Sequence, residues 1–106
     1  MAGPGHASRP LAVVTGASTG IGYELAKICA QEGFDLVVAA DEAEISKAAR
    51  DFEAFGAKVD AIKADLATSE GVDALYKKIG GRPVDALLAN AGRGLARVFS
   101  IRTLMT

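Results

Sequence analysis

The feature that most constrains the fold is a regular alternation of short apolar runs with segments of helical periodicity. The apolar runs are LAVVTG (residues 11–16), DLVVAA (35–40), KVDAIKA (58–64) and VDALLA (84–89). Such short runs, bounded by glycine or polar residues, favour strands that are buried in a sheet. The segments between them are long enough for helical crossovers, so neighbouring strands are predicted to run parallel. The third run is the least apolar and is expected nearer an edge.

The three intervening segments carry apolar residues three and four positions apart, which is the pattern of an amphipathic helix. Each pattern stops close to a glycine, and glycine commonly ends a helix. The predicted fold class is therefore α/β, with a parallel sheet of about four strands and helices packed on its faces. The predicted helical stripes are Ile21, Leu25, Ile28 and Cys29 before Gly33; Ile45, Ala48, Ala49, Phe52 and Phe55 before Gly56; and Val72, Leu75, Tyr76 and Ile79 between an N-cap at Thr68 or Ser69 and the pair Gly80-Gly81.

Glycines and hydroxyl residues crowd the turn TGASTGIG, which joins the first predicted strand to the first predicted helix. Gly16, Gly20 and Gly22 allow a tight bend and let backbone N–H groups approach an anion without a Cβ in the way. The start of the helix adds unpaired N–H groups and a partial positive charge. No lysine follows the last glycine, so this is not the phosphate loop of an ATPase. Two interpretations are left, a pyrophosphate site and a tight turn without a ligand. The turn also offers the hydroxyl donors Thr15, Ser18 and Thr19.

The spacing of this turn resembles that of the short-chain dehydrogenase/reductase family. The resemblance is carried by Thr15-Gly16-Ala17-Ser18-Thr19-Gly20-Ile21-Gly22, by Asp65-Leu66 after the third strand and by Asn90-Ala91-Gly92 after the fourth. It covers residues 11 to about 94. It implies the N-terminal, cofactor-binding half of such an oxidoreductase: a partial NAD(P)-binding Rossmann fold with strand order 3-2-1-4 and helices on both faces. The family reaction is hydride transfer between a nicotinamide cofactor and a carbonyl or alcohol substrate.

The resemblance also implies a role for each motif. The glycine turn holds the cofactor pyrophosphate, Asp65 and Leu66 lie by the adenine ring, and the Asn90-Ala91-Gly92 turn lines the cleft near the nicotinamide ribose. All three motifs follow predicted strands, and open α/β sheets bind ligands at the carboxyl ends of their strands. The plainer alternatives are that Asp65 caps a helix and that Asn90 is an ordinary turn residue.

Asp41 follows the second strand, 19 positions beyond Gly22. An acidic residue at about this spacing accepts hydrogen bonds from the adenosine ribose and repels a 2′-phosphate. Positions 17–19 and 41–42 hold no lysine or arginine, which family members that take NADP usually place there. The expected cofactor is therefore NAD rather than NADP. Glu42 is a candidate to share this role, and the alternative is a solvated acid at a helix start.

The catalytic groups of the family, a serine and a Tyr-x-x-x-Lys pair, have no convincing counterpart. The literal match Tyr23…Lys27 lies on the helix that directly follows the glycine turn, on the pyrophosphate side of the site, whereas the family's pair follows a fifth strand. After Gly94 the sequence indicates neither a fifth strand nor a long helix, and Ser100 has no base to activate it. No catalytic residue is assigned, and these residues alone are expected not to catalyse hydride transfer.

The predicted organisation is a flexible tail (1–10), one incomplete dinucleotide-binding domain (11–94) and an irregular tail (95–106). A net charge of −1 gives no basic field for nucleic acid, no apolar stretch is long enough for a membrane, and no metal-ligand cluster is present. The single cysteine suits a reducing compartment, so the expected location is cytoplasmic.

The sequence is also compatible with two other functions. One is a stand-alone module that binds a dinucleotide, and the other is an interaction protein that completes its sheet with another chain. The second alternative depends on the run at 84–89, which is expected at an open edge of the sheet, where self-association or partner binding occurs.

Overall fold

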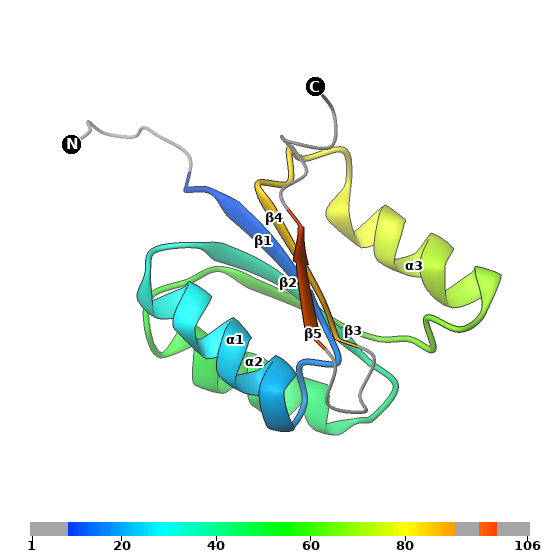
Figure 1. Cartoon of the computed structure of the whole chain (residues 1–106), viewed down its shortest axis with the longest axis horizontal. Coiled ribbons are helices and arrows are strands. Elements are labelled where there is room, and N and C mark those ends of the chain that lie inside the picture. Colours follow the sequence, from blue (N-terminus) through cyan, green and yellow to red (C-terminus); the bar gives the residue numbers. More distant parts are fainter. Residues whose placement is uncertain (1–8, 91–95, 100–106) are drawn as a thin grey trace.

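The structure, a computed structural model, describes residues 9–90 and 96–99, and its strands form one five-stranded sheet in the order β3-β2-β1-β4-β5 (Figure 1). The first four strands are parallel, and β5 is antiparallel to β4. The elements are β1 (Leu11–Thr15), α1 (Gly20–Gln31), β2 (Asp35–Ala40), α2 (Glu44–Glu53), β3 (Val59–Lys63), α3 (Ser69–Ile79), β4 (Ala86–Asn90) and β5 (Ala96–Phe99).

The predicted α/β class and the strand order 3-2-1-4 are confirmed. Strand β1 lies at the centre, with Val13 in register with Val37 of β2 and with Leu87 of β4. All residues of β1 are buried, whereas β3 is only partly buried and lies at an edge. Hydrophobicity therefore predicted correctly which strand is peripheral.

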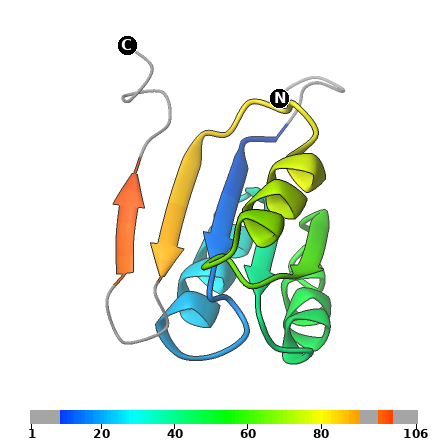
Figure 2. The same cartoon turned by 90° about the vertical axis from the view of Figure 1, so that its right-hand side faces the viewer.

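Helices cover both faces of the sheet, as predicted. Helices α1 and α2 lie together on one face, and α3 lies on the other (Figures 1 and 2). Because side chains alternate along a strand, Val14 and Val38 pack in the core beneath α1 and α2, while Val13 and Val37 pack with Leu75 of α3. The larger core thus lies on the side with two helices.

The edge beside β4 differs from the prediction. Residues 95–106 were expected to be irregular and β4 to have an open edge, but Ala96–Phe99 form β5, with Leu88 in register with Val98. An antiparallel strand needs only a short connection, so no crossover helix is required before β5. The unpaired backbone groups of β4 and the strand-favouring residues of the segment ARVF account for the pairing.

Helix α1 also differs from the prediction, because its small residues face the sheet. Its buried positions are Gly22, Ala26 and Ala30. Of the predicted stripe, Leu25 and Cys29 pack against the core, whereas Ile21 is 46% exposed and Ile28 is 51% exposed. Small side chains let the helix lie close to the strands. We infer that this close packing, rather than burial of the largest apolar side chains, sets the rotation of α1 about its axis.

The other two helices follow the predictions more closely. The stripe of α2 is buried as predicted except for Phe55, which is exposed. In α3, Leu75 and Ile79 pack on the sheet, while Val72 and Tyr76 are exposed. The N-cap of α3 is Thr68, and Gly80 ends the helix in the left-handed conformation, both as predicted.

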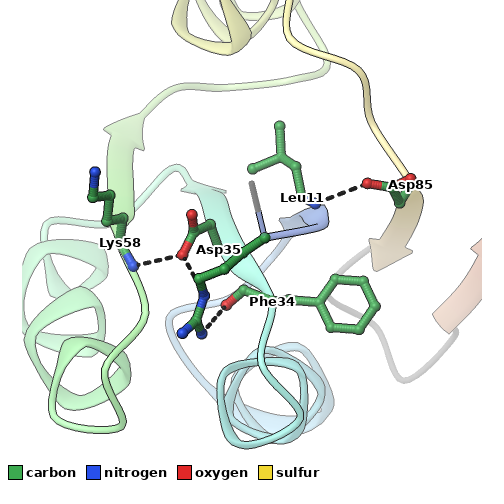
Figure 3. A network of polar contacts seen from close by, with 6 residues as sticks. Leu11, Phe34, Asp35, Lys58 and Asp85 are labelled. Atoms are coloured by element: carbon green, nitrogen blue, oxygen red, sulfur yellow. Dashed lines mark hydrogen bonds and ion pairs between the residues drawn. The ribbon is translucent and has the colours of Figure 1, made fainter. Parts of the chain in front are cut away.

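A polar network joins the amino ends of the strands, at the edge opposite the glycine turn (Figure 3). The Asp35 carboxylate accepts a hydrogen bond from the Lys58 backbone N–H at 3.0 Å and pairs with Arg9 at 3.0 Å. Asp85 accepts a 3.0 Å hydrogen bond from the Leu11 N–H. Arg9 was expected in a flexible tail, but these contacts fix it against β2; residues 1–8 of that predicted tail lie outside the described residues.

Candidate functional site

The carboxyl ends of the four parallel strands meet at one edge of the sheet (Figure 2). The glycine turn follows β1 at this edge, Asp41 and Glu42 follow β2, and Asp65 comes two residues after β3. From β1 the chain adds β2 and β3 on one side, and then returns to place β4 on the other side of β1. The direction in which strands are added therefore reverses next to the glycine turn. Open α/β sheets bind ligands at such a reversal.

The glycine turn has the backbone conformation that its composition predicts. Gly16 has φ +63° and Gly20 has φ +62°, values that residues with a Cβ rarely adopt. Thr19 and Gly20 are exposed, Thr15 is buried, and Gly22 is buried inside α1. Ile21 is half-exposed and lies at the start of the helix.

The start of α1 leaves its backbone donors without a side-chain cap. Thr19, the N-cap residue, makes no capping hydrogen bond through its side chain, whereas Thr68 of α3 accepts a 3.0 Å hydrogen bond from the Gly71 N–H. Uncapped N–H groups and the helix dipole attract an anion at this end of α1. The donor set therefore fits a pyrophosphate.

Two contacts tie the glycine turn to the end of β2. The Ala17 N–H donates to the Ala39 carbonyl oxygen at 3.3 Å, and the Ser18 hydroxyl donates to Oε1 of Glu42 at 2.8 Å. Sequence reasoning named Ser18 and Glu42 separately but missed their contact, since 24 positions separate them in the chain. Asp41 is exposed beside this pair.

Asp65 and Leu66 lie in the turn between β3 and α3. The Asp65 carboxylate accepts a 2.9 Å hydrogen bond from the Ala67 N–H, and its carbonyl oxygen accepts a hydrogen bond from the Thr68 hydroxyl at 2.7 Å. Thr68 rather than Asp65 is therefore the cap of α3. A shallow hollow of about 400 Å³ lies beside this turn, lined by Leu66, Ala67, Thr68, Ser69, Val72 and Asp73.

Sequence reasoning overlooked Gly71, which holds this turn against α3. A Cβ at Gly71 would lie 2.6 Å from the carbonyl carbon of Asp65 and closer still to its oxygen. Only glycine therefore lets the Asp65 backbone lie this near to the first turn of α3. A glycine inside a predicted first helical turn was the signal available in the sequence.

Of the third motif, Asn90-Ala91-Gly92, only Asn90 is among the described residues. Asn90 ends β4 and is in register with Ala96 of β5, so its backbone lies at the carboxyl edge. Ala91 and Gly92 lie outside the described residues.

Tyr23 is engaged in a contact between two helices. Its hydroxyl donates a 2.7 Å hydrogen bond to Asp51 of α2, and its ring packs 5.2 Å from the ring of Phe52. The hydrogen bond to Asp51, together with desolvation and the nearby negative charges, raises the pKa of Tyr23. A raised pKa opposes the phenolate form, so the contact supports the structural interpretation of the Tyr23…Lys27 match.

Among residues 9–90 and 96–99, no three histidine, cysteine or acidic side chains come together as metal ligands. No helix in the same residues is long and apolar enough to cross a membrane. Burial raises the pKa of the Cys29 thiol, which lowers its reactivity.

The fold and the glycine turn together define a nucleotide-binding α/β protein, and comparison with known proteins specifies the family. Residues 10–104 match the family model for short chain dehydrogenases, and the chain belongs to that family. It is 41% identical to gluconate 5-dehydrogenase of Gluconobacter oxydans in an alignment that covers 76% of this chain and 33% of that protein. An uncharacterized oxidoreductase of Bacillus subtilis is 33% identical over 77% of this chain and 35% of its own length.

Solved structures of the family have the same fold. L-sorbose reductase from Gluconobacter frateurii, complexed with NADPH and L-sorbose, superposes with a TM-score of 0.76 and 38% identity over 83% of this chain and 35% of that one. An alcohol dehydrogenase from Thermococcus sibiricus, complexed with 5-hydroxy-NADP, gives a TM-score of 0.69 and 32% identity over 74% of this chain and 35% of its own. The chain thus spans about one third of the length of these relatives.

Proposed function

We propose that this chain binds NAD(H) at the carboxyl edge of its sheet, as the cofactor-binding part of an oxidoreductase. The reaction proposed for the whole protein is hydride transfer between the nicotinamide and a carbonyl or alcohol substrate. The observation that carries the proposal is the glycine turn, where Gly16 and Gly20 have positive φ and α1 begins without a side-chain cap.

Each part of the edge has a task in this proposal. Backbone N–H groups between Ser18 and Gly22 hold the pyrophosphate, as the dipole of α1 favours. Asp41 accepts hydrogen bonds from the adenosine ribose, Asp65 and Leu66 lie by the adenine, and the turn from Asn90 to Gly92 lines the nicotinamide end. When bound, the cofactor supplies or accepts the hydride.

Local charge supports NAD over NADP. Asp41 and Glu42 are exposed at the end of β2, and no lysine or arginine is present at 17–19 or 41–42 to pair with a 2′-phosphate. Two solved relatives are complexes with NADPH and 5-hydroxy-NADP, which are both nucleotides of the NADP type. Our proposal of NAD depends on this chain's own acidic residues.

We also propose that these residues do not catalyse the reaction by themselves. General acid–base catalysis needs a group within hydrogen-bond reach of the substrate, and the tyrosine of the one Tyr-x-x-x-Lys match is bonded to Asp51. Incubation of the chain with NADH and a panel of ketones and aldehydes is expected to give no turnover. Turnover that Tyr23→Phe abolishes would contradict this expectation.

The alternative function, an interaction protein that completes its sheet with another chain, loses part of its support. Strand β5 pairs with the edge of β4 that was expected to be open. The location that we propose remains the cytoplasm, for which the single cysteine is the support.

Titration calorimetry with NAD⁺ tests the binding proposal, with Gly20→Ala as the disruptive variant. Gly56→Ala is the matched control, because both glycines have positive φ and open space where a Cβ would lie. Both substitutions introduce about 1–2 kcal/mol of left-handed backbone strain, but only Gly20 belongs to the proposed site. We expect Gly20→Ala to weaken NAD⁺ binding and Gly56→Ala to preserve it. Equal loss in both variants, or no binding by the wild type, would refute the proposal.

A further inference from the structure

The two edges of the parallel part of the sheet are protected in different ways. Strand β3, at one edge, contains the charged residues Asp60 and Lys63, and Asp60 pairs with Arg82 at 3.1 Å. Charged residues on an edge strand oppose pairing with another chain. Strand β4, at the other edge, has no charged residue from Ala86 to Asn90. Its edge is covered instead by β5, which runs antiparallel to it (Figure 2).

Without β5, the edge of β4 would be a template for another strand. Leu88 is buried in the core beneath α1 and α2, and Leu87 packs with the apolar cluster on the α3 side, so β4 is apolar on both faces. Strand β5 is in register with β4 from Leu87 to Asn90. Removal of β5 would therefore leave an uncharged, apolar strand with unpaired backbone groups, which is the kind of edge that recruits another chain.

The direction of β5 indicates which partner suits this edge. The other neighbouring strands of the sheet are parallel pairs, so the edge of β4 is the one place where an antiparallel strand is accommodated among the described residues. Two copies of β4 related by a two-fold axis perpendicular to the sheet also run antiparallel to each other. A second copy of this chain therefore presents a strand of the required direction, and the contact closes as a symmetric dimer.

We propose that β5 is a protective edge strand, and that the edge of β4 beneath it is a latent interface for a second copy of this chain. While β5 is paired, the chain is a monomer. When β5 detaches, β4 pairs with the β4 of another open copy and one sheet continues through both. This inference is independent of dinucleotide binding, so the failure of either proposal leaves the other standing.

The two forms are in equilibrium, which makes the effect measurable. Both copies must open before they pair, so the apparent dissociation constant of the dimer varies with the inverse square of the open fraction. A tenfold rise in that fraction lowers the constant about a hundredfold while the open form is the minor one. A small weakening of β5 therefore gives a large change in association.

The test uses two proline variants of the full chain, Val98→Pro and Phe99→Pro, which are each other's control. Consecutive residues of a strand direct their N–H groups to opposite edges, so only one of these two N–H groups faces β4. Proline has no N–H, and it is tolerated where that group faces away from the sheet. Hydrogen exchange of the wild type identifies the residue whose N–H faces β4, because that N–H is protected.

Size-exclusion chromatography with light scattering, over a range of concentrations, measures the association. We expect a monomeric wild type, a dimer for the variant that lacks the N–H facing β4, and wild-type behaviour for the other variant. The apparent dissociation constant of the dimer is expected to fall about a hundredfold in the first variant. Hydrogen exchange locates the interface, because the outward N–H groups of β4 should stay protected at high concentration and exchange on dilution.

Several results would overturn the proposal. These are equal association of both proline variants, folded monomers in both, or open-ended aggregates in place of a dimer. A wild type that dimerises and becomes monomeric with proline would show that β5 is exchanged between copies, and would overturn it as well. If circular dichroism shows an unfolded proline variant, Val98→Gly decides, because it weakens β5 but keeps the N–H. A folded Val98→Gly that associates no more than the wild type would contradict the protective role.

Discussion

The hydroxyl of Tyr23 on α1 donates a 2.7 Å hydrogen bond to the Asp51 carboxylate on α2. The contact is exposed, so its net contribution lies at the low end of the usual range for a hydrogen bond. We expect Tyr23→Phe, which keeps the ring packing on Phe52, to lower the free energy of unfolding by about 0.5 kcal/mol in urea titrations. Tyr76→Phe is the control, because Tyr76 is 79% exposed. An equal effect in both variants would contradict this role.

The same contact predicts a pH dependence. The hydrogen bond to Asp51 raises the pKa of Tyr23 above its usual value of 10.0, so folding favours the protonated phenol. The stabilisation is therefore fully present below about pH 10 and is lost as the pH rises through the raised pKa. The difference in unfolding free energy between wild type and Tyr23→Phe is expected to be constant from pH 7 to 9 and to shrink above pH 10. A difference that grows with pH would be inconsistent with this linkage.

Gly71 predicts a coupling between fold stability and the proposed adenine end of the site. In Gly71→Ala the new Cβ meets the backbone carbonyl of Asp65, so either α3 or the turn must move. We expect a loss of about 2 kcal/mol or more in unfolding free energy, measured in urea, and weaker NAD⁺ binding because Asp65 and Leu66 are displaced. Asp73→Ala, on the same helix and exposed, is expected to change stability by less than about 0.5 kcal/mol. Unchanged stability of Gly71→Ala would show that the turn adapts freely.

Asp41 gives a direct test of the nucleotide preference. In Asp41→Arg the repelling carboxylate is replaced by a guanidinium that pairs with phosphate, so the NADP⁺/NAD⁺ affinity ratio is expected to rise at least tenfold. Glu53→Arg reverses a charge at the far end of α2 and is expected to leave the ratio unchanged. Tighter binding of NADP⁺ than of NAD⁺ by the wild type would refute the proposed preference, whatever the variants do.

Asp35 is expected to be the most sensitive residue of the polar network at the amino ends of the strands. In Asp35→Ala the Lys58 N–H loses its acceptor and Arg9 loses its ion pair, and because the hydrogen bond is exposed we expect a cost of about 1–1.5 kcal/mol. Asp35→Asn keeps an acceptor for the N–H and loses only the exposed ion pair, so about 0–1 kcal/mol is expected. Thermal unfolding at low and high salt measures both, and only the ion-pair part should shrink with salt. Equal costs for the two substitutions would assign all of the stabilisation to the charge.

Much of the fold followed from the sequence because hydrophobicity reports burial on strands. The fully apolar runs became the buried strands β1 and β2, and the more polar run KVDAIKA became the edge strand β3. The ends of α3 were also predictable from local sequence, because Thr68 caps the start of the helix and Gly80 ends it.

The features that escaped prediction depend on contacts between distant segments. The Ser18–Glu42 bond joins residues 24 positions apart, and β5 forms because β4 offers an edge for it to pair with. No local pattern in either segment specifies such a partner. The proposed site was therefore predictable as a set of strand ends, but the hydrogen bonds within it were not.

The rotation of α1 about its axis can be tested by substitution. The pattern in the sequence predicts that changes at Ile28 destabilise the fold more than changes at Ala26, and the structure predicts the opposite. In the structure Ala26 is fully buried against the sheet, while Ile28 is 51% exposed. A larger side chain at Ala26 must push α1 away from the strands, so Ala26→Leu is expected to cost about 1–3 kcal/mol of unfolding free energy. Ile28→Ala removes an exposed side chain and is expected to cost less than about 0.5 kcal/mol.

If Ile21 and Ile28 faced the core instead, Ile28→Ala would cost about 2–5 kcal/mol. Urea titrations of the two variants and the wild type decide between these orientations. Ile28→Gln extends the test, because a polar side chain is tolerated on an exposed helix face and strongly disfavoured in a core. A larger loss in Ile28→Gln than in Ala26→Leu would show that α1 is rotated relative to the structure, and that Gly22, Ala26 and Ala30 do not set its distance from β1.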